Sequence, residues 1–386
     1  MRDVIIAGIG QTPVGEHWEI SLRSLAAKAM LAAIKDAGGI KPQALYVGNF
    51  LGPTVSHQEN LGALLADNVG LAGIEAFSVE AAGASGGAAL RVGVNAIASG
   101  FVDVALVVGV EKITDMVGPE VEAAATLSMD YDYEGITGMS APSQAALLMQ
   151  RYIHEYNPPR ESFGEFALTA HANGAGNPNA FFRKTIKKET YASAGMISDP
   201  LNLFDMGPYC DGAAAVLLTT RELVPANLPH PMVRVAGSSV VIDTLALHDR
   251  PDPLAFDAAR ISVERACRQA GIKPGDMDLF EVCDAFSIYA LLSLEAAGFA
   301  KRGEGWKLAQ SGDLALTGSL PVLTMGGCKA RGNPIAAAGV YQAVEAALQL
   351  RGEAGVNQVS AARLALIQSL GGPASTAAAH VLERLD

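Results

Sequence analysis

The chain has 386 residues, half of them hydrophobic, and a formal net charge of −12. This acidic balance argues against a general nucleic-acid-binding protein, which needs a basic surface. No apolar run reaches the roughly 18 residues that a membrane-spanning helix needs, so we expect a large packed core and no membrane span.

The cysteine and histidine patterns predict no metal site. The four cysteines form no CxxC pair, and the seven histidines form no HxxxH or HExxH pattern. Four cysteines without such spacing are most simply explained by a reducing, cytoplasmic setting. A predicted strand begins at Val4, which leaves no room for a signal or transit peptide before it.

The first part of the chain alternates between predicted strands and helices. A buried strand pattern from Asp3 to Gln11 is followed by a helix over Ser21–Ala37, which Ser21 caps and two glycines end. This alternation predicts a parallel sheet with helices on both faces. The next expected elements are a strand over 44–50, a helix over 58–68, a strand over 77–82, an Ala/Gly/Val-rich helix up to residue 100 and a strand over 102–110.

A turn of small residues at Gly83 joins the strand over 77–82 to the Ala/Gly/Val-rich helix. At such a turn, free backbone N–H groups and the positive end of a helix face whatever binds there. A nucleophile is typical of this position, but the sequence has glycine.

The segment from about residue 112 to 208 differs from the rest, because it holds many of the aromatic residues between Gly/Asn/Pro loops. Helices are expected over 143–156 and 159–172. Two interpretations stay open: a lid over the sheet edge where the turn at Gly83 opens, and a purely structural connector.

The second half repeats the pattern of the first. Gly83-Ala84-Ser85-Gly86 and Gly332-Asn333-Pro334 take roughly equivalent positions, and a ligand tends to bind between two such halves. A strand is expected over 211–219, before the second half begins. The elements expected in the second half are strands over 233–241, 279–282, 362–369 and 377–382, helices over 253–270, 287–298 and 335–351, and a loop over 325–334.

Several motifs, in order along the chain, resemble the thiolase superfamily: VEAAGASGGAAL, DGAAAVLL, CDAFSIYALLSLEAAGF and GGCKARGNPIAAAGV. The archaeal-type acetoacetyl-CoA thiolases and the sterol-carrier-protein thiolases are the most similar branches. The resemblance implies an α/β protein with a duplicated five-layer αβαβα fold. Residues 1–225 would form the first half, with an inserted loop domain over about 112–208, and residues 226–386 the second.

The resemblance also implies a ligand and partners. The expected ligand is a coenzyme A thioester, with no permanently bound cofactor, and the expected assembly is a homodimer or a dimer of dimers. Small residues in the glycine turns would contact this ligand: Gly83, Ser85, Gly86, Gly326, Gly327, Gly371 and Gly372.

The positions that carry thiolase chemistry hold other residues here. By the resemblance, Gly83 occupies the position of the family's nucleophilic cysteine, and Ala285 occupies the position of a second cysteine. Cys283 and Asn333 occupy the positions of two active-site histidines. The turn at Gly371-Gly372-Pro373 lacks the family's last cysteine. Without an acyl-cysteine the family's two-step acyl exchange cannot run, so Cys283 and Asn333 become the candidate catalytic residues.

Three functions stay open from the sequence. One is carbon–carbon bond chemistry on an acyl-CoA, as in thiolase-like aldolases that work with a zinc-ribbon/OB-fold partner. Those aldolases carry tyrosines at the positions of Cys283 and Asn333, whereas Tyr289 and Tyr341 here are expected farther along their helices, as packing residues. The second is a non-catalytic subunit that binds an acyl-CoA or a lipid and assembles with such a partner. The third is an acetyl-CoA acetyltransferase with an altered site.

Overall fold

The computed structural model describes residues 2–226 and 228–386. Nine strands form one continuous sheet in the order β3-β2-β4-β7-β1-β8-β11-β10-β9. Their bounds are β1 Val4–Gln11, β2 Ala44–Gly48, β3 Glu75–Val79, β4 Val104–Glu111, β7 Gly212–Thr220, β8 Met232–Ile242, β9 Leu279–Glu281, β10 Leu364–Gly371 and β11 Thr376–Leu385. A two-stranded sheet of β5 (Met196–Ser198) and β6 (Leu201–Asn202) lies apart from it.

The large sheet consists of two halves that are joined by few hydrogen bonds. Strands β3, β2, β4, β7 and β1 form the first half, and β8, β11, β10 and β9 form the second. Only two residue pairs, Ile5 with Arg234 and Ile6 with Val233, connect β1 to β8.

The prediction of a parallel sheet is wrong, because the sheet is mixed. Strand β2 runs parallel to β3 and β4, and β9 runs parallel to β10. Strand β7 is antiparallel to β4 and β1, and β11 is antiparallel to β10 and β8. Since a short connection of hairpin length joins β10 to β11, these two strands must run antiparallel.

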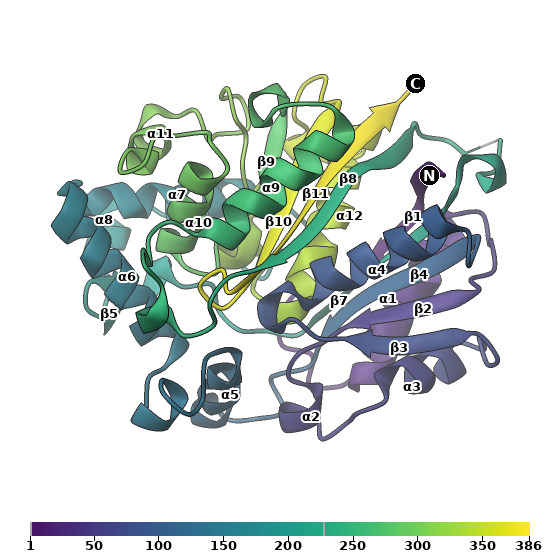
Figure 1. Cartoon of the computed structure of the whole chain (residues 1–386), viewed down its shortest axis with the longest axis horizontal. Coiled ribbons are helices and arrows are strands. Elements are labelled where there is room, and N and C mark those ends of the chain that lie inside the picture. Colours follow the sequence, from purple (N-terminus) through teal and green to yellow (C-terminus); the bar gives the residue numbers. More distant parts are fainter. Residues whose placement is uncertain (1, 227) are drawn as a thin grey trace.

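Helices cover both sheet halves and fill the space between them (Figure 1). Helices α4 (Ser85–Ser99) and α12 (Ala338–Arg351) contact each other and strands of both halves, so they form the central layer. The outer layers are α1 (Leu22–Asp36) and α3 (Leu61–Asn68) on the first half, and α9 (Asp257–Ala270) and α10 (Ser287–Ala296) on the second. The predicted five-layer αβαβα fold is confirmed.

The inserted segment supplies the helices α5 (Gly118–Ala125), α6 (Ala141–Tyr156), α7 (Gly164–Gly174) and α8 (Lys188–Ala192). Figure 1 shows these blue and teal helices gathered at one end of the molecule, with α6 and α7 packed against α10. The remaining helices are α2 (Gly52–Val55) and α11 (Gly305–Ser311). The division of the chain at residue 225 stays a prediction.

Several predicted elements differ from the structure; the helix expected from residue 58, for example, begins only at Leu61. The helix expected from Pro253 begins only at Asp257, because Phe256 has a left-handed backbone with φ of +47°. The loop expected over 325–334 contains a short π-helix, Gly327–Arg331, and such turns are frequent at functional sites. Within the two described ranges, no helix combines the length and the apolar character required to cross a membrane.

Candidate active site

A narrow cavity of about 70 Å³ lies where the two halves and the inserted segment meet. It has room for a few water molecules or for the reacting end of a thioester. The residues that line it are Phe50, Gly83, Ala125, Ser128, Ala141, Gln144, Tyr209, Cys283, Ala285, Phe286, Tyr289, Cys328, Asn333, Ile335, Ala338, Gln342, Ser369, Leu370 and Gly372. Ala125, Ser128, Ala141 and Gln144 come from the inserted segment, which therefore covers this site.

Gly83 lies in a single 3₁₀ turn, Ala82–Ala84, directly before α4. The backbone there is strained, since Ala82 has a φ of +49°. A Cβ atom on Gly83 would come within 2.5 Å of the carbonyl oxygen of Leu370 at the end of β10. Glycine therefore lets two backbone segments approach closely, and no space is left for a side chain.

Cys283 follows β9 and is buried in the wall of the cavity, with 8% of its surface exposed. The thiol of Cys328 donates a hydrogen bond to the Cys283 sulfur, and this bond lowers the pKa of Cys283 below its usual range although burial opposes it. The backbone N–H groups of Ala285 and Leu370 lower it further. Cys283 is thus the cysteine best prepared to exist as a thiolate.

Cys328 lies on the π-helix and has the opposite character. Donation to Cys283 and burial both raise the pKa of Cys328. Its backbone N–H donates to the Asp284 carboxylate at 2.6 Å, which ties the π-helix to the loop that carries Cys283. A Cβ on Gly327 would lie 2.6 Å from the same carboxylate, so this close contact requires glycine.

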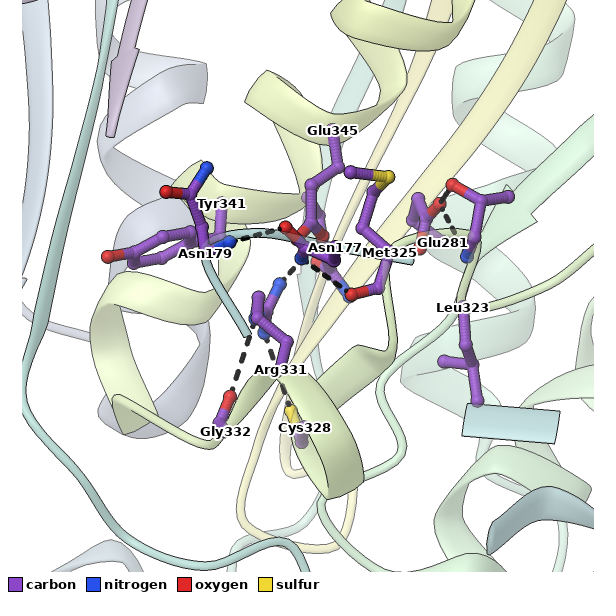
Figure 2. A network of polar contacts seen from close by, with 12 residues as sticks. Asn177, Asn179, Glu281, Leu323, Met325, Cys328, Arg331, Gly332, Tyr341 and Glu345 are labelled. Atoms are coloured by element: carbon purple, nitrogen blue, oxygen red, sulfur yellow. Dashed lines mark hydrogen bonds and ion pairs between the residues drawn. The ribbon is translucent and has the colours of Figure 1, made fainter. Parts of the chain in front are cut away.

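A buried ion pair joins Arg331, the last residue of the π-helix, to the central layer (Figure 2). The Arg331 guanidinium donates to Glu345 on α12 at 2.7 Å, and its second amino nitrogen lies 3.9 Å from the Cys328 sulfur. The guanidinium also lies 5.1 Å from the ring centroid of Tyr341. Arg331 therefore connects the thiol pair to the central layer.

Asn333 is held by its backbone. Its N–H donates to the Pro208 carbonyl at 2.9 Å, and its carbonyl accepts from the Cys210 N–H at 3.3 Å. The side-chain amide lines the cavity and makes no hydrogen bond to any residue that the structure describes. This amide is available to donate to a ligand carbonyl.

Two tyrosines that were not expected at the site also line the cavity. The helix α10 begins at Ser287 as predicted, but Tyr289 in its first turn lies beside the loop of Cys283 and reaches the cavity, which it was expected to miss. Tyr209 forms a bridge with Asn333. Burial is the main cause that raises the pKa of both phenols, so both stay protonated near neutral pH.

One feature of the sequence could have indicated Tyr209 as a site residue, namely its position two residues before Asp211, where the DGAAAVLL motif begins. Tyr341 does pack away from the cavity, as expected, since its hydroxyl donates to the Thr12 carbonyl at 2.9 Å.

The structure brings five of the residues predicted for the site to the cavity: Gly83, Cys283, Ala285, Asn333 and Gly372. The others pack outside its lining. Ser85 is fully buried and bonds the turn itself, accepting from Ala81 N–H at 2.9 Å. The remaining four glycines permit close contacts between backbone segments or with the buried Asp284: Gly86, Gly326, Gly327 and Gly371.

Within residues 2–226 and 228–386, no group of three or more His, Cys, Asp or Glu is placed to hold a metal ion.

Comparisons with known proteins agree with this architecture. Residues 4–222 match the family model described as Thiolase, N-terminal domain, and residues 239–384 match Thiolase C-terminal domain-like. An acetyl-CoA acetyltransferase of Methanothermobacter thermautotrophicus is 42% identical over the full length of both chains. Sterol carrier protein 2 of Oryctolagus cuniculus is 29% identical over 79% of this chain and 58% of its own length.

A solved structure described as Ltp2-ChsH2(DUF35) aldolase matches with a TM-score of 0.87 and 26% identity, over 99% of this chain and 98% of that one. The relatives support an acyltransferase-type enzyme. Both family models fit this chain in order and together span almost all of it; the chain belongs to the thiolase family.

Proposed function

We propose that this protein binds an acyl-CoA in the cavity beside Gly83 and makes or breaks a carbon–carbon bond without an acyl-cysteine intermediate. The observation that carries the proposal is the 2.5 Å separation between a Cβ at Gly83 and the Leu370 oxygen. A nucleophilic side chain at that position would require the end of β10 to move. Gly83, Cys283, Ala285 and Asn333 are accordingly taken as replacements of the family's catalytic residues.

The groups around the cavity suit an aldol-type reaction on a β-hydroxyacyl-CoA. The Cys283 thiolate takes the proton of the β-hydroxyl, the Cα–Cβ bond breaks, and its electron pair forms the enolate of the shortened acyl-CoA. The Asn333 amide donates to the thioester oxygen as negative charge develops there. Tyr289 or Tyr209, which stay protonated, give a proton to the enolate carbon, and the aldehyde or ketone leaves.

Proton return closes the cycle. After the carbon has been protonated, the proton taken by Cys283 passes to the phenolate of the tyrosine that donated, so both groups regain their starting states. The contact with Cys328 favours the thiolate form of Cys283 between turnovers, because it lowers the pKa of that thiol. No redox step and no further cofactor are needed.

We propose two kinds of partner. A second copy of the chain would pair through β3, which is an edge strand with Phe77 43% exposed. A zinc-ribbon/OB-fold protein is the second partner, supported by the DUF35 component named for the similar aldolase structure. In a non-catalytic subunit of such a complex, the same cavity would hold an acyl-CoA without turnover.

An acetyl-CoA acetyltransferase with an altered site is the second candidate function, favoured by the relative that is 42% identical. In that case Cys283, as the thiolate of the cavity, would carry the acyl group. The two candidates differ in a covalent intermediate, which mass spectrometry detects.

The test compares two substrates with one enzyme preparation. We expect release of an aldehyde from a 3-hydroxyacyl-CoA, and no thiolysis of acetoacetyl-CoA above background. Tyr289→Phe and Asn333→Ala are expected to reduce the cleavage rate about 10²–10⁴-fold, whereas Tyr341→Phe, which removes a buried hydroxyl outside the cavity, serves as the matched control.

Binding is measured by calorimetry on the same variants. Acetoacetyl-CoA thiolysis at an ordinary rate, with an acetyl group found on Cys283, would refute the aldol proposal in favour of the acetyltransferase. Binding without any turnover, alone or with a zinc-ribbon/OB-fold protein added, would favour the non-catalytic subunit.

A further inference from the structure

Two of the four cysteines lie side by side in the cavity wall. Cys283 and Cys328 both line the cavity, and the Cys328 N–H donates at 2.6 Å to the carboxylate of Asp284, the residue next to Cys283. This bond holds the two thiols beside each other, close enough for each to shift the pKa of the other. They come from different elements, the loop after β9 and the π-helix, so the sequence separation of the pair gives no hint of the contact. Both are free thiols in this structure.

The pair combines the two roles that thiol–disulfide exchange needs. Cys283 accepts hydrogen bonds from a thiol and from two backbone N–H groups, which favours a thiolate able to attack a disulfide. Cys328 is protonated and in contact with Cys283, which is the position of a resolving thiol. The Asp284 carboxylate fixes the π-helix through the Cys328 N–H at 2.6 Å, so the contact is held by the fold.

The other two cysteines lack these features. Cys210 and Cys267 are buried outside the cavity lining, and burial raises the pKa of both thiols, to about 11 for Cys267. Neither interacts with another cysteine in the described chain. They provide matched internal controls.

We propose that Cys283 and Cys328 form a covalent modification site for low-molecular-weight disulfides. The reagent is CoA disulfide, because it contains the same coenzyme A group as the acyl-CoA proposed to bind in the cavity. The CoA part of this proposal rests on the proposed acyl-CoA function, whereas the thiol pair itself does not.

The reaction proceeds in two balanced steps. The Cys283 thiolate attacks one sulfur of CoA disulfide, the S–S bond breaks, and CoA thiolate leaves, giving a mixed disulfide on Cys283. Cys328 then loses its proton to the departing CoA thiolate and attacks the Cys283 sulfur, which releases a second CoA. The two protein thiols are oxidised to one disulfide, and CoA disulfide is reduced to two CoA thiols.

Oxidation changes the site. The Cys283 thiolate is consumed, and the loop after β9 becomes bonded to the π-helix across the cavity wall. Turnover that depends on Cys283 is expected to stop and to return on reduction with dithiothreitol.

The experiment treats the full chain with CoA disulfide in one arm and with diamide, which needs no CoA site, in the other. Free thiols are then alkylated in denaturant, and peptides are mapped by mass spectrometry. We expect a disulfide between the Cys283 and Cys328 peptides in both arms, formed more than about tenfold faster than any modification of Cys210 or Cys267.

Variants separate the steps. Cys328→Ser is expected to stop at a stable Cys283–CoA adduct, Cys283→Ser is expected to give neither product, and Cys267→Ser is expected to behave as the unchanged chain does. Circular dichroism verifies that each variant is folded, and the unmodified chain gives the main result without any substitution.

The two arms distinguish the failures. Absence of the Cys283–Cys328 disulfide with diamide would overturn the thiol-pair proposal, whatever happens to acyl-CoA binding. Formation of the disulfide with diamide but not with CoA disulfide would support the thiol pair and overturn CoA disulfide as its reagent. Acyl-CoA binding, measured by calorimetry on the same chain, then shows separately whether the proposed acyl-CoA site fails as well.

Discussion

Replacing Gly83 by alanine tests the physical basis of the candidate site with a single methyl group. The new Cβ would lie 2.5 Å from the Leu370 oxygen, well inside the distance at which carbon and oxygen normally touch. The obstacle is backbone, because Leu370 belongs to β10 and pairs with Ala377 of β11. It cannot move aside as a flexible side chain does.

The cost follows from overpacking. Inserting a methylene into a well-packed region typically destabilises a protein by about 1–3 kcal/mol, and we expect Gly83→Ala to fall within this range. Glycine-to-alanine substitution also stabilises by about 0.4–1 kcal/mol through the unfolded chain. A control must therefore carry the same entropy change without the collision.

Gly275→Ala is that control, because Gly275 is exposed in a 3₁₀ turn and a Cβ there meets no atom within 4 Å. Relative to Gly275→Ala, we expect Gly83→Ala to lose about 1–3 kcal/mol in urea unfolding. With an unfolding entropy of about 2.1 cal/mol/K per residue, this corresponds to a Tm lower by about 1–4 °C. Equal stability of the two variants would refute the reasoning, and would reopen the position to a nucleophilic side chain.

Three other perturbations have definite expected outcomes. Arg331→Met leaves the buried Glu345 carboxylate without its cation, and we expect it to destabilise the protein by about 3–5 kcal/mol in urea unfolding. The Arg331→Met/Glu345→Leu double variant should recover stability, and no recovery would contradict the ion-pair explanation. Desolvation lowers the pKa of the buried His380 to about 3, so this side chain stays neutral in the folded chain. In the unfolded chain it binds a proton below about pH 6.5. The free energy of unfolding should therefore fall by about 1.4 kcal/mol for each pH unit below 6.5. His380→Gln should remove that share of the pH dependence, and an unchanged slope would reject it. Phe77→Asp on the edge strand β3 should convert a dimer to a monomer in light scattering, and an unchanged mass would exclude this edge as the interface.

Local sequence patterns were sufficient to predict much of the fold. Ser21 does cap α1, and the apolar runs at β4, β7 and β8 are strands close to their expected bounds. Strand direction was not predictable from alternation, because it depends on which connections are hairpins and which are crossovers. The start of α9 was missed because nothing in the sequence announces a left-handed backbone at Phe256.

The candidate site was predictable where motif positions coincide with the cavity, as for Cys283 and Asn333. The contact between Cys283 and Cys328 depends on a π-helix, and no periodicity of side chains predicts one. Tyr209 lies outside the family motifs and reaches the cavity through a strand-like bridge to Asn333, so no motif position predicts it. The obstacle at Gly83 is a carbonyl group, and any residue at position 370 would supply it.

The scarcity of hydrogen bonds between β1 and β8 has a consequence for the alignment of the cavity. Since Gly83 belongs to one half and Cys283 to the other, their spacing depends on how α4 packs against α12. At that contact a Cβ on Gly339 would lie 2.6 Å from the backbone nitrogen of Gly87, so the two helices meet backbone to backbone. The distance between the two walls of the cavity therefore depends on residues outside it. A substitution at the contact between α4 and α12 can change which substrate fits while every residue that lines the cavity stays the same.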